Sequence, residues 1–129
     1  MPVGSSSASP LFPGQKFEFT FDAESGDRLT LATMFGQSND IFAGTPDTGL
    51  DLFTNDIPLM GDITSMLSLW DAGTEVNEKP GIGLNQAPRQ SAPNTGPSEN
   101  GAVRTVANSG DGFTYAMITD LIKVTIEAN

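Results

Sequence analysis

The chain has 129 residues, of which 16 are acidic and six are basic, so its formal net charge at pH 7 is −10. This length fits one domain with a single core, and the negative charge argues against nucleic acid and anionic membrane surfaces as partners. The chain has neither Cys nor His, which excludes disulfides, Ser-His-Asp and Cys-His catalysis, and the commonest zinc ligands.

Other sequence features concern the compartment. An extracellular protein without Cys is more typical of bacteria, because animal extracellular modules usually depend on disulfides. The apolar runs are only a few residues long, far short of the roughly 20 that a membrane-spanning helix needs. Residues 1–9 lack the basic start and apolar core of a signal peptide, so in an exported protein the leader would precede this numbering.

The first predicted element is a hairpin over residues 16–35. Residues 16–22 alternate apolar and polar side chains, which predicts a half-buried strand with three Phe on one face: Phe17, Phe19 and Phe21. Residues 24–27 have turn chemistry, and residues 29–35 alternate again, which predicts the second strand.

Shorter and less regular segments follow. Apolar runs at residues 50–53 and 63–70 predict further strands, although the mixed spacing of the second also fits a helical turn. Residues 76–110 are dominated by Pro, Gly, Asn, Gln and Ser, which predicts a long irregular loop, ordered because it is not of low complexity. Within it, Asn100-Gly101 is a hairpin-type turn signal before residues 103–106.

The C-terminal part predicts one more strand. Residues 121–126 alternate in the pattern of a closing strand, and residues 113–120 fit either a short helical turn or a loop. Several short strands with turns between them and no long helix predict an all-β, antiparallel β-sandwich with one long irregular loop.

Two acidic loops carry the candidate site. Asp40 ends the first loop, and Asp71 and Glu75 lie in the second, Trp70–Glu78. Two carboxylates four residues apart repel each other unless a cation or proton intervenes, and calcium takes roughly 6–8 oxygen ligands from such loops. Solvated loop carboxylates are the simpler alternative and are favoured on these residues alone.

Five motifs together resemble a known family: Gly26-Asp27-Arg28-Leu29, Thr33-Met34-Phe35-Gly36-Gln37-Ser38-Asn39-Asp40, Leu69-Trp70-Asp71-Ala72-Gly73-Thr74-Glu75-Val76-Asn77-Glu78, Asn85-Gln86-Ala87-Pro88-Arg89-Gln90 and Pro93-Asn94-Thr95-Gly96. The chain resembles the spondin N-terminal domain family in its bacterial branch, related to the calcium-binding domain of F-spondin. The resemblance implies a C2-like β-sandwich with one Ca²⁺, held by Asp40, Asp71 and Glu75, in a secreted or cell-surface protein. Asn39, Asn77 and loop carbonyls are weaker candidates to complete the shell.

The chain departs from the family pattern in two places. Glu75 stands where the animal domains usually carry Asp, and one extra methylene changes the reach of the carboxylate. Family members open with a further strand, whereas residues 1–12 are short and Ser-rich. We therefore expect an N-terminal tail or shortened edge strand over residues 1–12 and the sandwich domain over residues 13–129. A missing strand would leave an open edge that invites strand donation from another chain.

The expected function is a non-enzymatic, calcium-binding extracellular recognition or adhesion module, with a glycan, an extracellular protein or other copies of itself as partner. The alternative is a structural subunit of an extracellular fibre or surface assembly joined by N-terminal strand donation. Glycoside hydrolysis by Asp71 and Glu75 is a weaker third hypothesis. Trp70 is expected in the core, with a sugar-stacking or interface role as its alternative. Arg89 is either a surface cation or a fork that pairs a carboxylate and pins the long loop.

Overall fold

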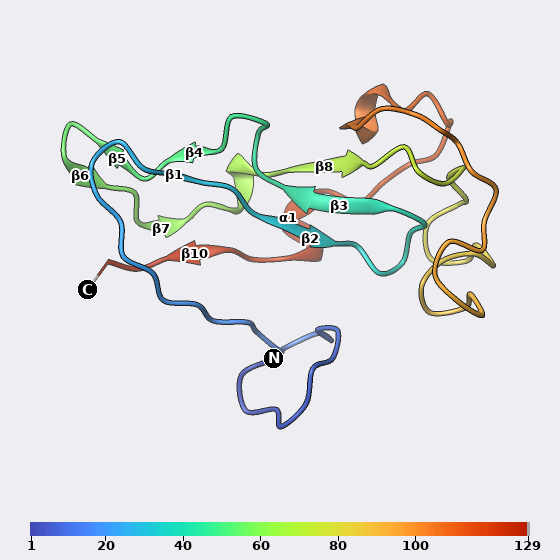
Figure 1. The fold of residues 1–129 in the computed structure, drawn as a ribbon, viewed down its shortest axis with the longest axis horizontal. Coiled ribbons are helices and arrows are strands. Elements are labelled where there is room, and N and C mark those ends of the chain that lie inside the picture. Colours follow the sequence, from blue (N-terminus) through green and yellow to red (C-terminus); the bar gives the residue numbers. More distant parts are fainter. Residues whose placement is uncertain (129) are drawn as a thin grey trace.

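The computed structural model describes residues 1–128, so residue 129 of the expected domain lies outside the described part. Its main sheet has four antiparallel strands in the order β2-β3-β8-β9 (Figure 1). These are β2 (Ala32–Met34), β3 (Ile41–Gly44), β8 (Ser68–Asp71) and β9 (Arg104–Thr105). β3 and β8 lie in the middle, and Ile41 is paired with Asp71 across them.

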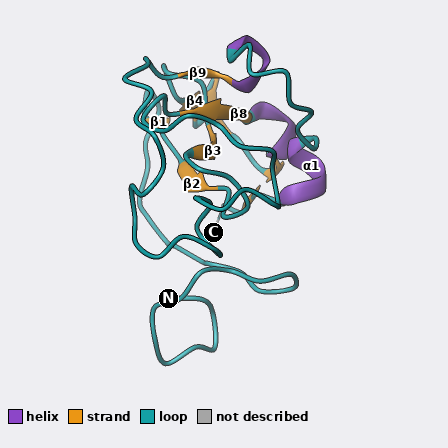
Figure 2. Cartoon of the chain, turned by 90° about the vertical axis from the view of Figure 1, so that its right-hand side faces the viewer, coloured by secondary structure: helices purple, strands orange, loops and turns teal. Residues whose placement is uncertain are grey.

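Three two-stranded antiparallel sheets complete the β structure. They pair β1 (Arg28–Leu29) with β4 (Leu50–Asp51), β5 (Phe53–Thr54) with β6 (Ile57–Pro58), and β7 (Gly61–Asp62) with β10 (Thr125–Ile126). Within residues 1–128, helical structure is limited to η1 (Thr64–Met66), η2 (Val106–Asn108) and α1 (Ile118–Leu121), and the helical turns lie to one side of the strands (Figure 2). The prediction of an all-β, antiparallel, sandwich-like fold is confirmed, while its C2-like character stays a prediction.

The core is small and centred on the middle strands. Ile41, Ala43 and Leu69 are buried together. The partly buried residues packed against them come from several segments: Phe35, Val106, Tyr115, Ile118, Leu121 and Ile122. Trp70 is half-buried, and its Nε1 donates to the carbonyl of Gly44 at 3.2 Å. Alternation along β3 and β8 therefore buries one face of this sheet, as period-2 patterning requires.

The predicted hairpin over residues 16–35 is wrong. Residues 28–29 and 32–34 do form strands, but they pair with β4 and β3 and not with residues 16–22, which form no strand. Arg28 helps to select this pairing, because its guanidinium donates to Asp51 at 2.6 Å and to the carbonyl of Thr48 at 2.6 Å. A local sequence pattern shows that a strand is possible but does not choose its partner.

Two other segments differ from their predicted lengths. Residues 63–70 split into the 3-10 turn η1 and strand β8, because Asp62 Oδ1 accepts the Thr64 N–H at 2.9 Å and so fixes a turn there. The closing strand, predicted over residues 121–126, is confined to β10, because α1 continues to Leu121. α1 is the short helical turn that was one of the two alternatives for residues 113–120.

The long loop and the N-terminal region lack regular structure. Between β8 and β9 the described residues form neither helix nor strand, apart from an isolated bridge between Glu75 and Ser98. Asn100 has φ of 56°, the left-handed conformation expected of the Asn-Gly turn. No strand begins before Arg28, and Val3 N donates to the carbonyl of Lys16 at 2.8 Å. No described helix is long and apolar enough to cross a membrane.

Candidate metal centre

The two acidic loops meet at one end of the main sheet. Asp40 immediately precedes β3, Asp71 ends β8, and these two strands are neighbours. The backbone links the loops as well, because Ala72 N donates to the carbonyl of Asp40 at 3.3 Å. The antiparallel register therefore explains why Asp40 and Asp71, which are 31 positions apart in sequence, lie together.

The Asp40 carboxylate holds the second loop in place. Its Oδ2 accepts the Thr74 N–H at 2.7 Å, the Thr74 hydroxyl at 2.6 Å and the Glu75 N–H at 3.0 Å. Its Oδ1 is buried and has no hydrogen-bond partner. Burying a carboxylate oxygen without a partner costs free energy. A cation bound to Oδ1 would remove that cost.

Asp71 is fully buried and is more completely satisfied. Its Oδ1 accepts the Gly73 N–H at 2.8 Å. Its Oδ2 accepts Asn77 Nδ2 at 2.9 Å and Arg104 Nη2 at 2.8 Å. Arg104 Nη2 also donates to Glu99, and that hydrogen bond raises the pKa of Arg104 above its usual range. A guanidinium therefore already balances the charge of Asp71.

Glu75 is buried beneath the long loop. Its Oε1 accepts the Gly96 N–H at 3.3 Å, and Val76 N donates to the carbonyl of Pro97 at 2.8 Å. A Cβ added at Gly96 would lie 3.2 Å from Glu75 Oε2. The loop backbone thus passes so close to this carboxylate that a larger residue at Gly96 would crowd it.

The predicted ligands are brought to one end of the sheet, but they do not form one coordination group. Within residues 1–128, no three acidic side chains lie close enough together to hold a metal ion. The donor chemistry nevertheless fits calcium: Asp40 Oδ1 is unpartnered, and Asp71 Oδ1 and Glu75 Oε1 each accept one hydrogen bond and keep another lone pair. Binding would require the oxygens to move closer together.

Gly73 fixes the shape of the second loop. It has φ of 70°, and its carbonyl accepts the Gly101 N–H at 2.7 Å. A Cβ at this position would lie 2.8 Å from the Gly101 carbonyl carbon and 2.9 Å from the Ala102 oxygen. Both the positive φ and the close backbone approach therefore require glycine.

Gly73→Ala is expected to lower the free energy of unfolding by about 2 kcal/mol, because it adds backbone strain and a steric clash. Urea unfolding in chelator would measure this change. Gly26→Ala is the matched control, since Gly26 has φ of 100° but nothing within 4 Å of an added Cβ. Equal losses in the two variants would contradict the proposed contact with residues 101–102.

Glu78, the last residue of the second acidic motif, is the centre of a second polar cluster. Its Oε2 accepts the Asn85 N–H at 2.8 Å and Asn39 Nδ2 at 3.1 Å, while Glu78 N donates to Asn39 Oδ1 at 3.0 Å. This cluster joins the first acidic loop to the long loop. Asn39 therefore has a structural role in this arrangement. In the sequence, only its position beside Asp40 in the motif of residues 33–40 pointed to such a role.

The stability that Glu78 contributes is expected to depend on pH. Partial burial raises the pKa of Glu78, but hydrogen bonds from Asn85, Asn39 and Leu84 outweigh it and place the pKa below the ordinary value of 4.5. A depressed pKa contributes stability above pH 4.5 that is lost as the pH falls through the folded-state value. Glu78→Gln should therefore flatten the acid limb of a urea-unfolding profile, and an unchanged limb would contradict this assignment.

Arg89, which is exposed, and Gln86, which is buried, hold the long loop together through hydrogen bonds. Arg89 Nε donates to the carbonyl of Gly83 at 2.7 Å, and its Nη2 donates to Gln86 Oε1 at 2.6 Å and to Gln37 Oε1 at 3.2 Å. Gln86 is fully buried, and its Nε2 donates to the carbonyl of Lys79 at 2.9 Å. Arg89 is exposed, as the surface-cation alternative expects, and its guanidinium also pins the loop, but its acceptors are amide and carbonyl oxygens and not the expected carboxylate.

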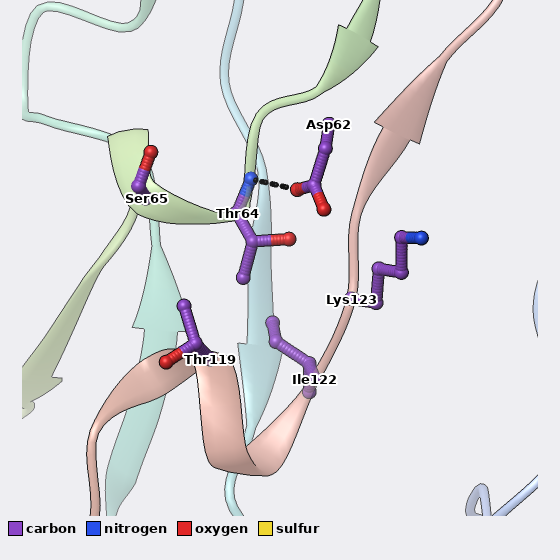
Figure 3. A pocket seen from close by; sticks show the side chains of 6 residues that line it. All are labelled: Asp62, Thr64, Ser65, Thr119, Ile122 and Lys123. Carbon is purple, nitrogen blue, oxygen red and sulfur yellow. Dashed lines mark hydrogen bonds between the residues drawn. The ribbon is translucent and has the colours of Figure 1, made fainter.

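The protein has one hollow beside these loops and another away from them. One of about 300 Å³ lies beside Arg104 and Asp111, and Tyr115 Oη donates to Asp111 Oδ2 at 2.5 Å. Burial and this hydrogen bond raise the pKa of Tyr115. Another of about 410 Å³ is lined by Asp62, Thr64, Ser65, Thr119, Ile122 and Lys123 (Figure 3). In the second hollow Asp62 is engaged by the Thr64 backbone, so its carboxylate has a structural role.

Neither a family model, nor a curated protein, nor a solved structure matches this chain. The resemblance to the spondin N-terminal domain family therefore stays a prediction from the motifs.

Proposed function

We propose that the chain is a non-enzymatic, calcium-binding recognition or adhesion module of a secreted or cell-surface protein. The observation that carries this proposal is Asp40 Oδ1, a buried carboxylate oxygen without a partner at the meeting point of two acidic loops. Leaving a buried acceptor unpaired costs about 1–3 kcal/mol, and more for a charged group. A bound divalent cation would remove this cost.

Asp40, Asp71 and Glu75 would hold the ion. Bound calcium would neutralise their charge and tie the first acidic loop to the second. Asp71 would keep its hydrogen bond from Gly73 and share its charge with Arg104. These roles are structural, because each carboxylate is already engaged by its own or a neighbouring loop, and this supports a binding module over a glycosidase.

The long loop offers the contact surface for a partner. It carries three large apolar side chains that are more than 60% exposed: Ile82, Leu84 and Val103. The same loop contacts Glu75 and Glu78 through Gly96 and Asn85. Loops held by a rigid β scaffold commonly carry recognition, so an ion at this site would act by ordering the surface that meets a glycan or an extracellular protein.

Direct calcium binding tests the proposal. Equilibrium dialysis against calcium is expected to give one ion per chain, with magnesium as the competing control. Asp40→Asn is expected to weaken binding strongly, while Asp47→Asn, in an exposed loop, is the matched control and should bind as the parent does. Absence of binding, or equal binding by both variants, would refute the site.

The second candidate function is a structural subunit of an extracellular fibre or surface assembly joined by N-terminal strand donation. It is favoured by the N-terminal region, because residues 1–27 contribute no strand to any described sheet. Electron microscopy should then show filaments that disappear when residues 1–12 are removed. A chain that stays soluble and unassembled at high concentration would eliminate this candidate.

A further inference from the structure

Residues 16–22 form an exposed, extended segment with three aromatic side chains. Phe17, Phe19 and Phe21 are 38%, 77% and 52% exposed, and the rings of Phe17 and Phe19 are 6.2 Å apart. Within the described residues, no backbone hydrogen bond engages residues 17–22, and the segment belongs to no strand. In Figure 1 it lies toward the opposite end of the molecule from the loops of the candidate metal centre.

This segment is complementary to itself. When two copies of Lys-Phe-Glu-Phe-Thr-Phe-Asp are placed antiparallel about Phe19, that residue faces its own counterpart, Phe17 faces Phe21, and Lys16 faces Asp22. A two-fold axis makes every unlike pair occur twice. Aromatic pairs and opposite charges across antiparallel strands are stabilising, so both the apolar and the charged positions favour this register.

The neighbouring registers that keep the three Phe on one face are disfavoured. A shift of two residues in one direction places Glu18 opposite its own counterpart, and a shift in the other direction places Glu18 opposite Asp22 twice. Like charges directly opposite each other are destabilising. The charges therefore select the register centred on Phe19.

We propose that residues 16–22 pair with the same residues of a second copy of this chain in a two-fold symmetric antiparallel arrangement. This proposal is independent of calcium binding. The segment supplies the unpaired backbone donors and acceptors that strand addition uses. Because the contact is the same on both copies, it closes at the dimer and does not continue into a fibre.

The expected dimer is weak. Three Phe rings with these exposures present on the order of 300 Å² of aromatic surface per copy, compared with about 800 Å² per partner in a standard stable interface. Lys16 is 2.6 Å from Glu18 in its own chain, and both side chains are about two-thirds exposed. Such a pair contributes little, so Lys16 can turn to Asp22 of the second copy at small cost.

Sedimentation across a concentration series in chelator tests the proposal with charge reversal. Lys16→Asp and Asp22→Lys each place like charges opposite one another twice, and each is expected to weaken dimerisation about tenfold or more. The double variant restores opposite charges and should dimerise within a few-fold of the parent. Phe19→Ser should abolish the dimer, while Met60→Ser, at an exposed apolar position outside both this segment and the long loop, should not.

Cross-linking tests the register independently, because the parent has no Cys. Residues directly opposite in an antiparallel pair have Cα atoms roughly 4.5–5.5 Å apart, within disulfide range. Phe19→Cys lies on the two-fold axis and should form a covalent dimer on mild oxidation much faster than Thr20→Cys, which faces Glu18 of the other copy.

Three results would overturn the proposal. They are a parent that stays monomeric at every concentration, equal cross-linking of Phe19→Cys and Thr20→Cys, and a dimer that the double charge reversal does not restore. The last result would mean that residues 16–22 pair with another edge, such as β10. The segment is exposed throughout, so these variants should keep the parent's unfolding midpoint, and circular dichroism would check that they do.

Discussion

Calcium is expected to raise the midpoint of thermal unfolding by about 10 °C at a hundredfold excess over its Kd. Ligand binding to the folded state alone contributes about 2.7 kcal/mol at that excess, and 1 kcal/mol shifts the midpoint of a domain of this size by about 4 °C. The rise should be specific to calcium, because magnesium prefers a tighter octahedral shell and keeps its water. Calorimetry in chelator, in calcium and in magnesium would measure these shifts.

Asp40→Asn is expected to remove most of the calcium-dependent rise. The amide keeps a carbonyl oxygen for the hydrogen bonds from Thr74 and Glu75, and its NH₂ group can take the place of the unpartnered Oδ1. The variant should therefore unfold near the parent's midpoint in chelator. A variant that responds to calcium as the parent does would show that Asp40 is not a ligand, and a parent without any response would remove the calcium proposal itself.

Arg104→Met is expected to lower the free energy of unfolding by about 3 kcal/mol in chelator. The change leaves Asp71, which is fully buried, without its cationic partner, and removing one partner of a buried pair costs about 3–5 kcal/mol. The lower end of this range of free energies applies because the Arg104 side chain is 25% exposed. Urea unfolding would measure the loss, and calcium should recover part of it by supplying the missing positive charge.

The control for this change is Arg28→Met. Arg28 pairs with Asp51 at 2.6 Å, but the two side chains are 44% and 61% exposed, and such surface pairs contribute about 0–1 kcal/mol. Adding Asp71→Asn to Arg104→Met should recover stability, because the buried charge is then gone. Equal losses for Arg104→Met and Arg28→Met would show that the Asp71 pair contributes no more than a surface ion pair.

Arg104 is the residue of the candidate site that sequence reasoning missed. It follows a run of Pro, Gly and Ser and carries no motif, so nothing local marks it as the partner of Asp71. β9 places it there by pairing with β8, where Arg104 and Asp71 are opposite residues. A contact between residues 33 positions apart depends on which strands become neighbours, and a single sequence does not specify that.

The sequence by itself excluded disulfides and catalysis by His or Cys, and it predicted the class of fold. Absence of His and Cys is a fact of composition, and the short alternating segments predict strands because side-chain direction reverses at every residue of a strand. It also singled out Asp40, Asp71 and Glu75, through motifs that resemble those of a known family, and their role as ligands stays a prediction. Each of these conclusions depends on local sequence.

Only the tertiary structure decided which strands pair and which charges meet. The alternation of residues 16–22 is as regular as that of any buried strand, yet these residues remain unpaired while residues 32–34 join β3. Likewise, the spacing of Asp71 and Glu75 fits both solvated carboxylates and a cation site, and it does not reveal that a guanidinium contacts Asp71. Pairing and charge balance are set by contacts between distant segments, whose free energies depend on neighbours that no local pattern contains.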